Sequence, residues 1–182
     1  MSSFSRNKFR SIEVVSGPAL VPTIGWTVLA VFGQTLFARF ALFHGTVPSL
    51  VTIAVVLYSV KAGAGRGALL GVFAGSLEDS LAGSGGAWTI ATTLMGLAAG
   101  TVARGFFSDG FVMLGGLVAL GIVLRDTVFW VVMSLEGYPR GLARTHVHST
   151  LWQAAITGLC ALLYLVLRTR FIADRTAVER FP

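Results

Sequence analysis

Charged residues are scarce in this sequence. Asp, Glu, Lys and Arg together make up 12% of the 182 residues, whereas a typical soluble domain carries about 25%. Apolar residues account for 54% of the chain, and its mean hydropathy is +0.78. This composition excludes an ordinary soluble domain and predicts an integral membrane protein, with residues 1–182 forming a single transmembrane domain.

Cysteines and catalytic motifs are also lacking. The one cysteine, Cys160, lies inside an apolar run, so the chain can form no intrachain disulfide and no thiolate metal site. The sequence contains no Ser-His-Asp arrangement, Walker motif or haem ligand set, and the glycine tract at 83–86 has no following Lys-Ser/Thr. We therefore expect a protein that is not an enzyme and needs no cofactor.

Metal ligands are few as well. His146 and His148 form a His-x-His pair in the polar loop expected at residues 136–148. A metal ion needs three or four ligands, and only Glu136 is an obvious third. We expect no metal site there. Trp88 and Trp152 begin two of the apolar runs described next, as interfacial anchors do.

Long apolar runs fill most of the chain. A helix needs about 20 apolar residues to cross the hydrocarbon core of a membrane. We predict an all-α bundle of six transmembrane helices, at residues 18–38, 47–60, 67–82, 87–107, 111–135 and 149–167. The second run is short and rich in β-branched residues, which would also suit a tilted interfacial helix or a re-entrant segment.

The positions of the basic residues favour six crossings. The net charge of +6 would suggest a nucleic-acid partner in a soluble chain, but here Lys and Arg gather at the ends of apolar runs, where they set topology and meet anionic lipid. With six crossings one face holds Arg6, Lys8, Arg10, Lys61, Arg66, Arg104, Arg168, Arg170, Arg175 and Arg180, and the other holds Arg39, Arg140 and Arg144. We therefore predict that both termini are cytoplasmic, with membrane lipids and no nucleic acid among the partners.

Four charged residues interrupt the apolar runs: Glu78 and Asp79 in the third, and Arg125 and Asp126 in the fifth. A charge at a helix centre costs about 2.5–3.5 kcal/mol on insertion scales. At 1.5 Å per residue the two pairs lie roughly 18 and 22 Å into helices that run in the same direction, so they share a depth. We expect Arg125 to pair with Asp79 or Glu78. The carboxylates have two alternative roles. They could form a site for a partner or ligand, or they could relay protons or cations.

Small residues recur at helical spacing in the third and fourth runs. Gly67, Gly71 and Gly75 step by four residues, as do Gly96 and Gly100. Glycines at this spacing make a flat groove that a second helix can approach closely. The groove can serve internal packing or receive a partner helix, and both alternatives stay open at this point.

The order of these features resembles the MreD family of bacterial rod-shape-determining membrane proteins. The resemblance covers nearly the whole chain. It rests on Pro48 before an apolar run that ends in Tyr58, on Gly71-x-x-x-Gly75-x-x-x-Asp79 followed by a small-residue turn, and on Asp126-Thr-Val-Phe-Trp130.

This resemblance implies a non-enzymatic scaffold of the cell-elongation complex in the bacterial cytoplasmic (inner) membrane. Such a protein binds MreC, a bitopic protein, and through it supports the RodA polymerase and a class B penicillin-binding transpeptidase, coordinated with MreB filaments. The implied fold is similar to the substrate-binding components of energy-coupling-factor transporters. The alternative function is therefore a substrate-binding component for a vitamin or metal, with Glu78, Asp79, Trp88, Arg125 and Asp126 lining an outward-facing pocket.

Overall fold

The computed structural model describes residues 20–37, 46–106 and 110–178 of the chain. Every secondary-structure element in these ranges is helical, which confirms the all-α fold class. The α-helices are α1 (Leu20–Phe37), α2 (Leu50–Ala62), α3 (Ala64–Ala82), α4 (Ala87–Phe106), α5 (Phe111–Leu135) and α6 (Ala143–Val178), and the 3₁₀ helix η2 (Arg140–Leu142) precedes α6.

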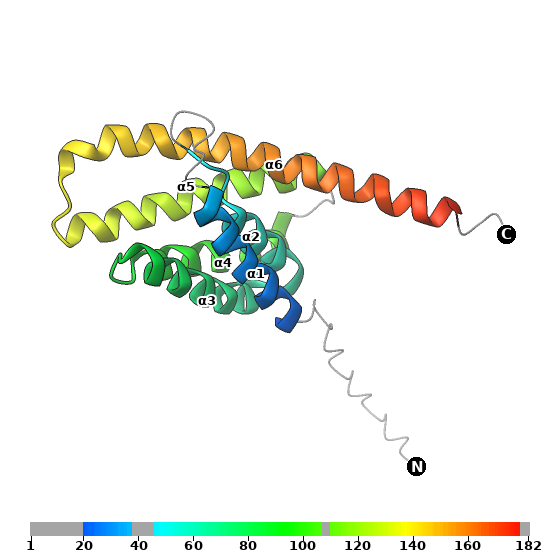
Figure 1. Cartoon of the computed structure of the whole chain (residues 1–182), viewed down its shortest axis with the longest axis horizontal. Helices are drawn as coiled ribbons and strands as arrows, with labels where there is room; N and C mark the ends of the chain where they lie inside the picture. The colour runs from blue at the N-terminus through cyan, green and yellow to red at the C-terminus, as the bar shows by residue number, and fades with distance from the viewer. Residues whose placement is uncertain (1–19, 38–45, 107–109, 179–182) are drawn as a thin grey trace, which may run out of the picture.

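The helical hairpins α3–α4 and α5–α6 have their turns at the same end of the bundle (Figure 1). The turn between α3 and α4 and the turn between α5 and α6 both lie at the left-hand end in Figure 1. They also approach each other, because a Cβ placed on Gly85 would lie 3.7 Å from the Glu136 carboxylate. We call this end, formed by residues 83–86 and 136–142, the turn end. The opposite end, where Lys61, Arg104 and Arg168 lie, is called the basic end.

The short helix α2 is the centre of the bundle. It contacts each of the other five α-helices, and its Val51, Val55 and Val56 are fully buried. The surrounding helices each contribute to the same core cluster, with Val31, Leu70, Met95, Val118 and Ala161. The second apolar run therefore forms a largely buried helix at the centre of the bundle.

Three helices differ most from their expected bounds. Helix α2 spans Leu50–Ala62 rather than residues 47–60, and Ser49 caps its N-terminus. Helix α3 begins at Ala64 rather than at residue 67, because Gly63 alone makes the turn from α2. Its φ is +87°, a value that favours glycine, and its N–H donates to the Ser59 carbonyl at 2.8 Å. Helix α6 begins at Ala143 rather than at residue 149 and continues to Val178, since no proline interrupts this stretch.

The outer surface of the bundle is apolar. Two described helices are long and apolar enough to cross a membrane, α5 over 25 residues and α6 over the 27 residues Ala143–Thr169. Helices α1 and α2 are apolar but shorter. Val112 is 77% exposed, and Leu120 and Leu159 are each 67% exposed. Outward-facing apolar side chains of this kind support a membrane location.

Candidate functional site

Arg125, in the middle of α5, is the centre of the candidate site. Its side chain is buried, with 3% of the residue exposed. Nη2 donates to Glu78 Oε1 of α3 at 2.9 Å, forming an ion pair. Nη1 donates to two hydroxyls near the start of α2, Ser49 Oγ at 3.1 Å and Thr52 Oγ1 at 2.9 Å. One guanidinium group therefore ties α5 to both α3 and α2.

The hydroxyls that receive Arg125 are held in place by the start of α2. Ser49 is the N-cap of this helix, and its Oγ accepts a hydrogen bond from the Thr52 N–H at 3.2 Å. The Ser49 N–H in turn donates to Thr157 Oγ1 of α6 at 3.0 Å. The cap thus fixes two acceptors for Arg125 and anchors α6 to the same point.

An aromatic stack covers the flat face of Arg125. The guanidinium carbon lies 4.4 Å from the centroid of the Trp88 ring at the start of α4. Trp88 stacks on Phe129, with centroids 3.9 Å apart and an interplanar angle of 16°. The His146 ring continues the stack: its centroid lies 6.3 Å from that of Phe129 and 4.8 Å from that of Trp130. This stack holds the guanidinium over Trp88 and adds a favourable cation–π contact.

Asp79 does not pair with Arg125. Its Oδ1 accepts from the Trp88 N–H at 3.0 Å and from Ser84 Oγ at 2.5 Å. Its Oδ2 accepts from the Thr89 N–H at 2.8 Å and from Thr89 Oγ1 at 2.6 Å. The carboxylate therefore caps the N-terminus of α4, where free N–H groups and the helix dipole favour a negative charge. We expected Arg125 to pair with Asp79 or Glu78, and in the structure it pairs with Glu78.

Asp126 belongs to the α5–α6 interface. Its Oδ2 accepts a hydrogen bond from Thr150 Oγ1 of α6 at 2.9 Å. Its backbone carbonyl lies 3.2 Å from Nε2 of His146. Oδ1 is buried and has no hydrogen-bond partner among the described residues. Asp126 therefore faces away from the Glu78–Arg125 pair and holds the second hairpin together.

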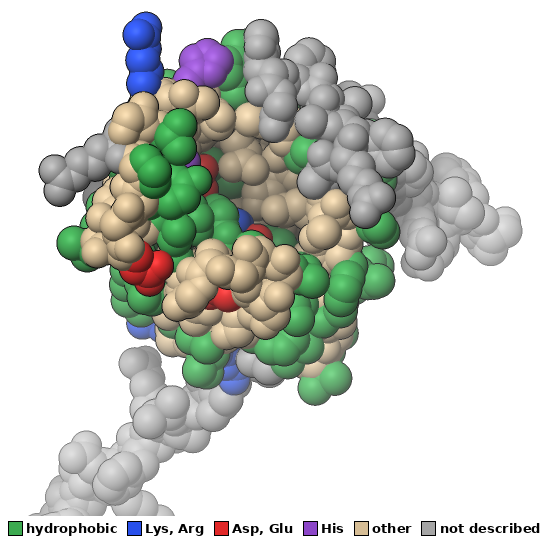
Figure 2. All heavy atoms as spheres, turned by 60° about the vertical axis from the view of Figure 1, so that its left-hand side comes forward, with side chains coloured by type: hydrophobic (Ala, Val, Ile, Leu, Met, Phe, Trp, Pro, Cys, Tyr) green, Lys and Arg blue, Asp and Glu red, His purple; other side chains and the backbone are tan. Residues whose placement is uncertain are grey.

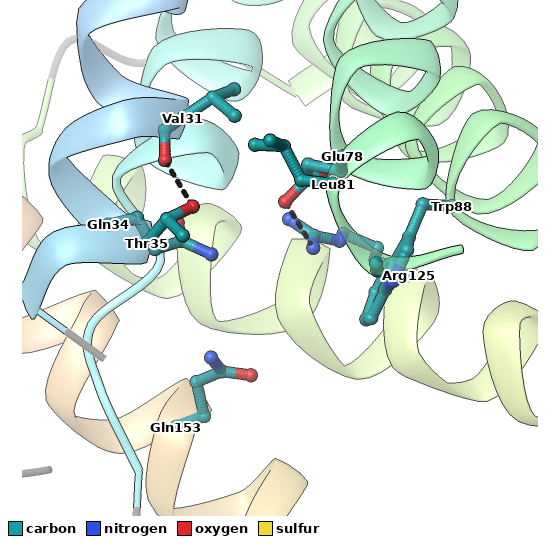
Figure 3. Close-up of a pocket in the computed structure, with 9 residues that line it drawn as sticks. Val31, Gln34, Thr35, Glu78, Leu81, Trp88, Arg125 and Gln153 are labelled. Atoms are coloured by element: carbon teal, nitrogen blue, oxygen red, sulfur yellow. Dashed lines mark hydrogen bonds and ion pairs between the residues drawn. The ribbon is translucent and has the colours of Figure 1, made fainter. Parts of the chain in front are cut away.

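A cavity of about 260 Å³, lined by both apolar and polar side chains, opens beside the ion pair, near the turn end. Figure 2 shows this end of the molecule hollowed, with acidic and basic side chains at the base of the hollow. In Figure 3, Gln34 and Thr35 of α1 lie across the cavity from Glu78 and Arg125, and Gln153 lies below them. The described residues that line the cavity are Val31, Gln34, Thr35, Glu78, Leu81, Ala82, Trp88, Arg125 and Gln153.

The cavity can hold a small polar molecule without net charge. Its two charged groups, Glu78 and Arg125, neutralise each other. Gln34 Oε1 accepts from the Val51 N–H at 3.4 Å, and Gln153 Nε2 donates to the Val47 carbonyl at 3.0 Å, so each amide is oriented by the backbone. Asp79 and Asp126 do not line the cavity, which corrects the expected set of five pocket residues.

The five glycines singled out from the sequence, Gly67, Gly71, Gly75, Gly96 and Gly100, all lie in the seam between α3 and α4. A Cβ on Gly71 would lie 2.5 Å from the Thr92 carbonyl oxygen, and one on Gly100 would lie 2.5 Å from the Ala64 Cα. Gly67 and Gly96 face each other, and Gly75 faces the start of α4. The groove is filled by the chain's own helix, so of the two alternatives left open by the sequence the structure has internal packing at these glycines.

The two histidines expected in a loop lie in α6. His146 is part of the aromatic stack, and His148 lies 3.3 Å from the indole nitrogen of Trp152. Across the described ranges, no three His, Cys, Asp or Glu side chains lie close enough to share a metal ion. Trp152 sits in the third turn of α6 rather than at its start, because the helix begins earlier than expected.

Sequence reasoning missed several members of the site. Ser49 and Thr52 form an S-x-x-T pattern before an apolar run, which is a recognisable cap signal that could have located both hydroxyls. Gln34 and Gln153 are polar residues within apolar runs, which marks them as inward-facing but not as neighbours. Phe129 carries no signal, because a phenylalanine in an apolar run is the usual case.

Comparison of the chain with protein-family models, with curated proteins and with solved structures finds no match. The resemblance to MreD proteins therefore rests on the residues and their spacing. The function that follows from it is a proposal, and its support comes from the geometry of the bundle.

Proposed function

We propose that this chain is a non-enzymatic membrane scaffold similar to MreD. It would cross the bacterial cytoplasmic membrane six times with both termini in the cytoplasm, and bind an MreC-like bitopic partner. Through that partner it would support RodA, its class B penicillin-binding transpeptidase and MreB filaments in peptidoglycan synthesis and cell shape. The observation that carries the proposal is an apolar cleft on the partly buried side of α2, where Ile53, Ala54 and Leu57 lie.

This cleft lies between α1, α2 and α6 and has a volume of about 450 Å³. Ile53 and Leu57 of α2 line it, together with Trp26 of α1 and Tyr164 of α6. The lining also includes two small side chains, Ala54 and Cys160. In lipid, helices associate by close packing at small residues, so a partner's transmembrane helix is a fitting occupant.

The charge at the basic end supports the proposed orientation. A Cβ on Gly63 would lie 2.7 Å from an Nη atom of Arg104, so the last turn of α4 adjoins the α2–α3 turn. Lys61 and Arg168 line the same cleft at this end. The positive-inside rule places such a cluster in the cytoplasm and the turn end outside.

Cross-linking through Cys160 tests the proposal directly, because it is the chain's one cysteine. Single cysteines placed along the partner's transmembrane helix should cross-link to Cys160 with a helical period of three to four residues. Ala54→Leu should reduce both cross-linking and co-purification because it narrows the cleft.

A matched control moves the cysteine to the lipid-facing side of α5. In the variant with Cys160→Ser and Leu120→Cys, cross-linking should be absent, since Leu120 is 67% exposed and lines no part of the cleft. Equal cross-linking from position 120, or cross-linking without a helical period, would remove the cleft as the binding face.

A second candidate function is supported by the cavity beside Arg125. A substrate-binding transporter component needs an outward-facing pocket with polar groups in it, and Glu78 and Arg125 line a cavity near the turn end together with Trp88. A panel of vitamins and metal ions should then raise the melting temperature of the purified chain. Gln153→Leu, which removes a lining amide, should abolish that shift. If no compound in the panel raises the melting temperature and the partner cross-links at Cys160, the transporter function is rejected and the scaffold function is retained.

A further inference from the structure

Two cations at the basic end have no acidic partner within the described ranges. Lys61 lies in the last turn of α2, and Arg168 lies in α6. Both side chains are exposed, and the ion pair found in the described part of the chain joins Arg125 to Glu78 instead. Long basic side chains at a helix end extend toward the membrane surface, where they attract anions.

These cations lie at the junction of two apolar spaces. One is the cleft beside α2, and the other is a cavity of about 290 Å³ between α2, α4, α5 and α6. The cavity is walled by Val60, Ala103, Leu114 and Leu165, and no acidic side chain is among the described residues that line it. Lys61 and Arg168 line both spaces, so the site combines an apolar interior with two positive charges.

We propose that this site binds an anionic phospholipid. Lys61 and Arg168 would hold the phosphate, and an acyl chain would occupy the cavity walled by Leu114 and Leu165. Arginine suits this role because its planar guanidinium can donate two parallel hydrogen bonds to phosphate oxygens. The apolar walls disfavour a hydrophilic anion such as free phosphate, since they offer its remaining oxygens no donors.

The cytoplasmic leaflet is rich in anionic lipid, which agrees with the orientation argued above. This inference rests on the membrane location in the proposed function, and not on the partner. A chain found in the soluble fraction would overturn both, whereas failure of lipid selectivity in a membrane-inserted chain would overturn this inference alone.

The experiment uses the full chain, purified in detergent and stripped of lipid. It is titrated with dioleoylphosphatidylglycerol or dioleoylphosphatidylcholine, and the complexes are counted by native mass spectrometry. Phosphatidylglycerol should bind at least about fivefold more tightly than the zwitterionic lipid. Each cation near an anionic surface raises the affinity about fivefold. The double variant with Lys61→Gln and Arg168→Gln loses two cations, so it should bind phosphatidylglycerol about 30-fold more weakly.

Matched variants separate a defined site from general charge attraction. Arg66→Gln removes an exposed cation near the start of α3 that lines neither space, and it should change the affinity less than twofold. Leu114→Trp should weaken binding by filling the cavity, whereas Leu120→Trp, on the exposed face of α5, should not. Equal losses in Arg66→Gln and the double variant would overturn the proposal. So would a double variant that binds lipid normally but no longer cross-links to the partner, because the cations would then belong to the partner's site.

Discussion

Arg125 and Glu78 form a buried ion pair whose remaining contacts come from neutral groups. Nη1 of Arg125 is bound by Ser49 and Thr52, and the second oxygen of Glu78 accepts from Thr92 Oγ1 at 3.5 Å. Removing one partner of such a pair leaves an uncompensated buried charge, which costs about 3–5 kcal/mol. Removing both partners leaves no charge, so the two substitutions should not add.

A double-mutant cycle tests this coupling. Arg125→Leu should destabilise the chain by about 3–5 kcal/mol, and adding Glu78→Leu should recover at least about 1 kcal/mol of the loss. Adding Asp79→Leu instead should recover nothing, because Asp79 caps α4. Thermal unfolding in detergent measures all three variants. A rescue by Asp79→Leu that equals the rescue by Glu78→Leu would contradict the observed pairing.

Asp79 makes a separate prediction as the cap of α4. Asp79→Ala removes the carboxylate oxygens that accept hydrogen bonds from the Trp88 and Thr89 N–H groups. It should lower the free energy of unfolding by about 1–2 kcal/mol. Amide hydrogen exchange should accelerate at these two residues. The control is Ser80→Ala, since the Ser80 hydroxyl donates only to the Ser76 carbonyl of its own helix, at 2.7 Å. Equal melting temperatures for the two variants would argue against a capping role.

At the scale of elements, the α3–α4 seam decides how closely two helices approach. Glycine in a helix interior is destabilising by itself, by about 1 kcal/mol relative to alanine. At Gly71 this cost is offset because the backbone of α4 occupies the place of a side chain. At Gly65, in the same helix, a Cβ would meet nothing within 4 Å.

These two glycines therefore predict opposite results for the same substitution. Gly71→Ala should destabilise the chain by about 1–3 kcal/mol, because the Thr92 carbonyl must move. Gly65→Ala should leave stability unchanged or raise it by up to about 1 kcal/mol. Melting temperatures in detergent distinguish them. A neutral Gly71→Ala would show that α4 can move away from α3 at little cost.

The four-residue glycine spacing predicted a close helix contact, and the structure has one. The spacing could not say which helix fills the groove, because any helix backbone fits a flat glycine face. The turn glycines at 83–86 were also predicted as a turn, and Gly83, Gly85 and Gly86 all have positive φ. A local backbone requirement is readable from sequence, whereas the identity of a packing partner is not.

At the scale of the whole molecule, the proposed topology places the turn end and the chain termini on opposite sides of the membrane. Alkaline phosphatase is active only outside the cytoplasm, so its fusion after Gly137 should be active and its fusion after Pro182 inactive. Green fluorescent protein at the C-terminus should fluoresce. An active phosphatase at the C-terminus would place that terminus outside the cytoplasm, and the proposed orientation would fail.

The sequence by itself determined that the chain is helical and apolar, roughly where its six helices lie, and which charged residues interrupt them. These properties depend on composition and on local backbone preferences, which act over a few residues. Only the tertiary structure decided that Glu78 pairs with Arg125 while Asp79 caps α4. Successive residues on an α-helix point about 100° apart, so adjacent carboxylates meet different neighbours. Only the tertiary structure likewise decided that a cleft lies beside α2 and that Lys61 and Arg168 line the same two spaces, because helices distant in the chain must pack together to form them.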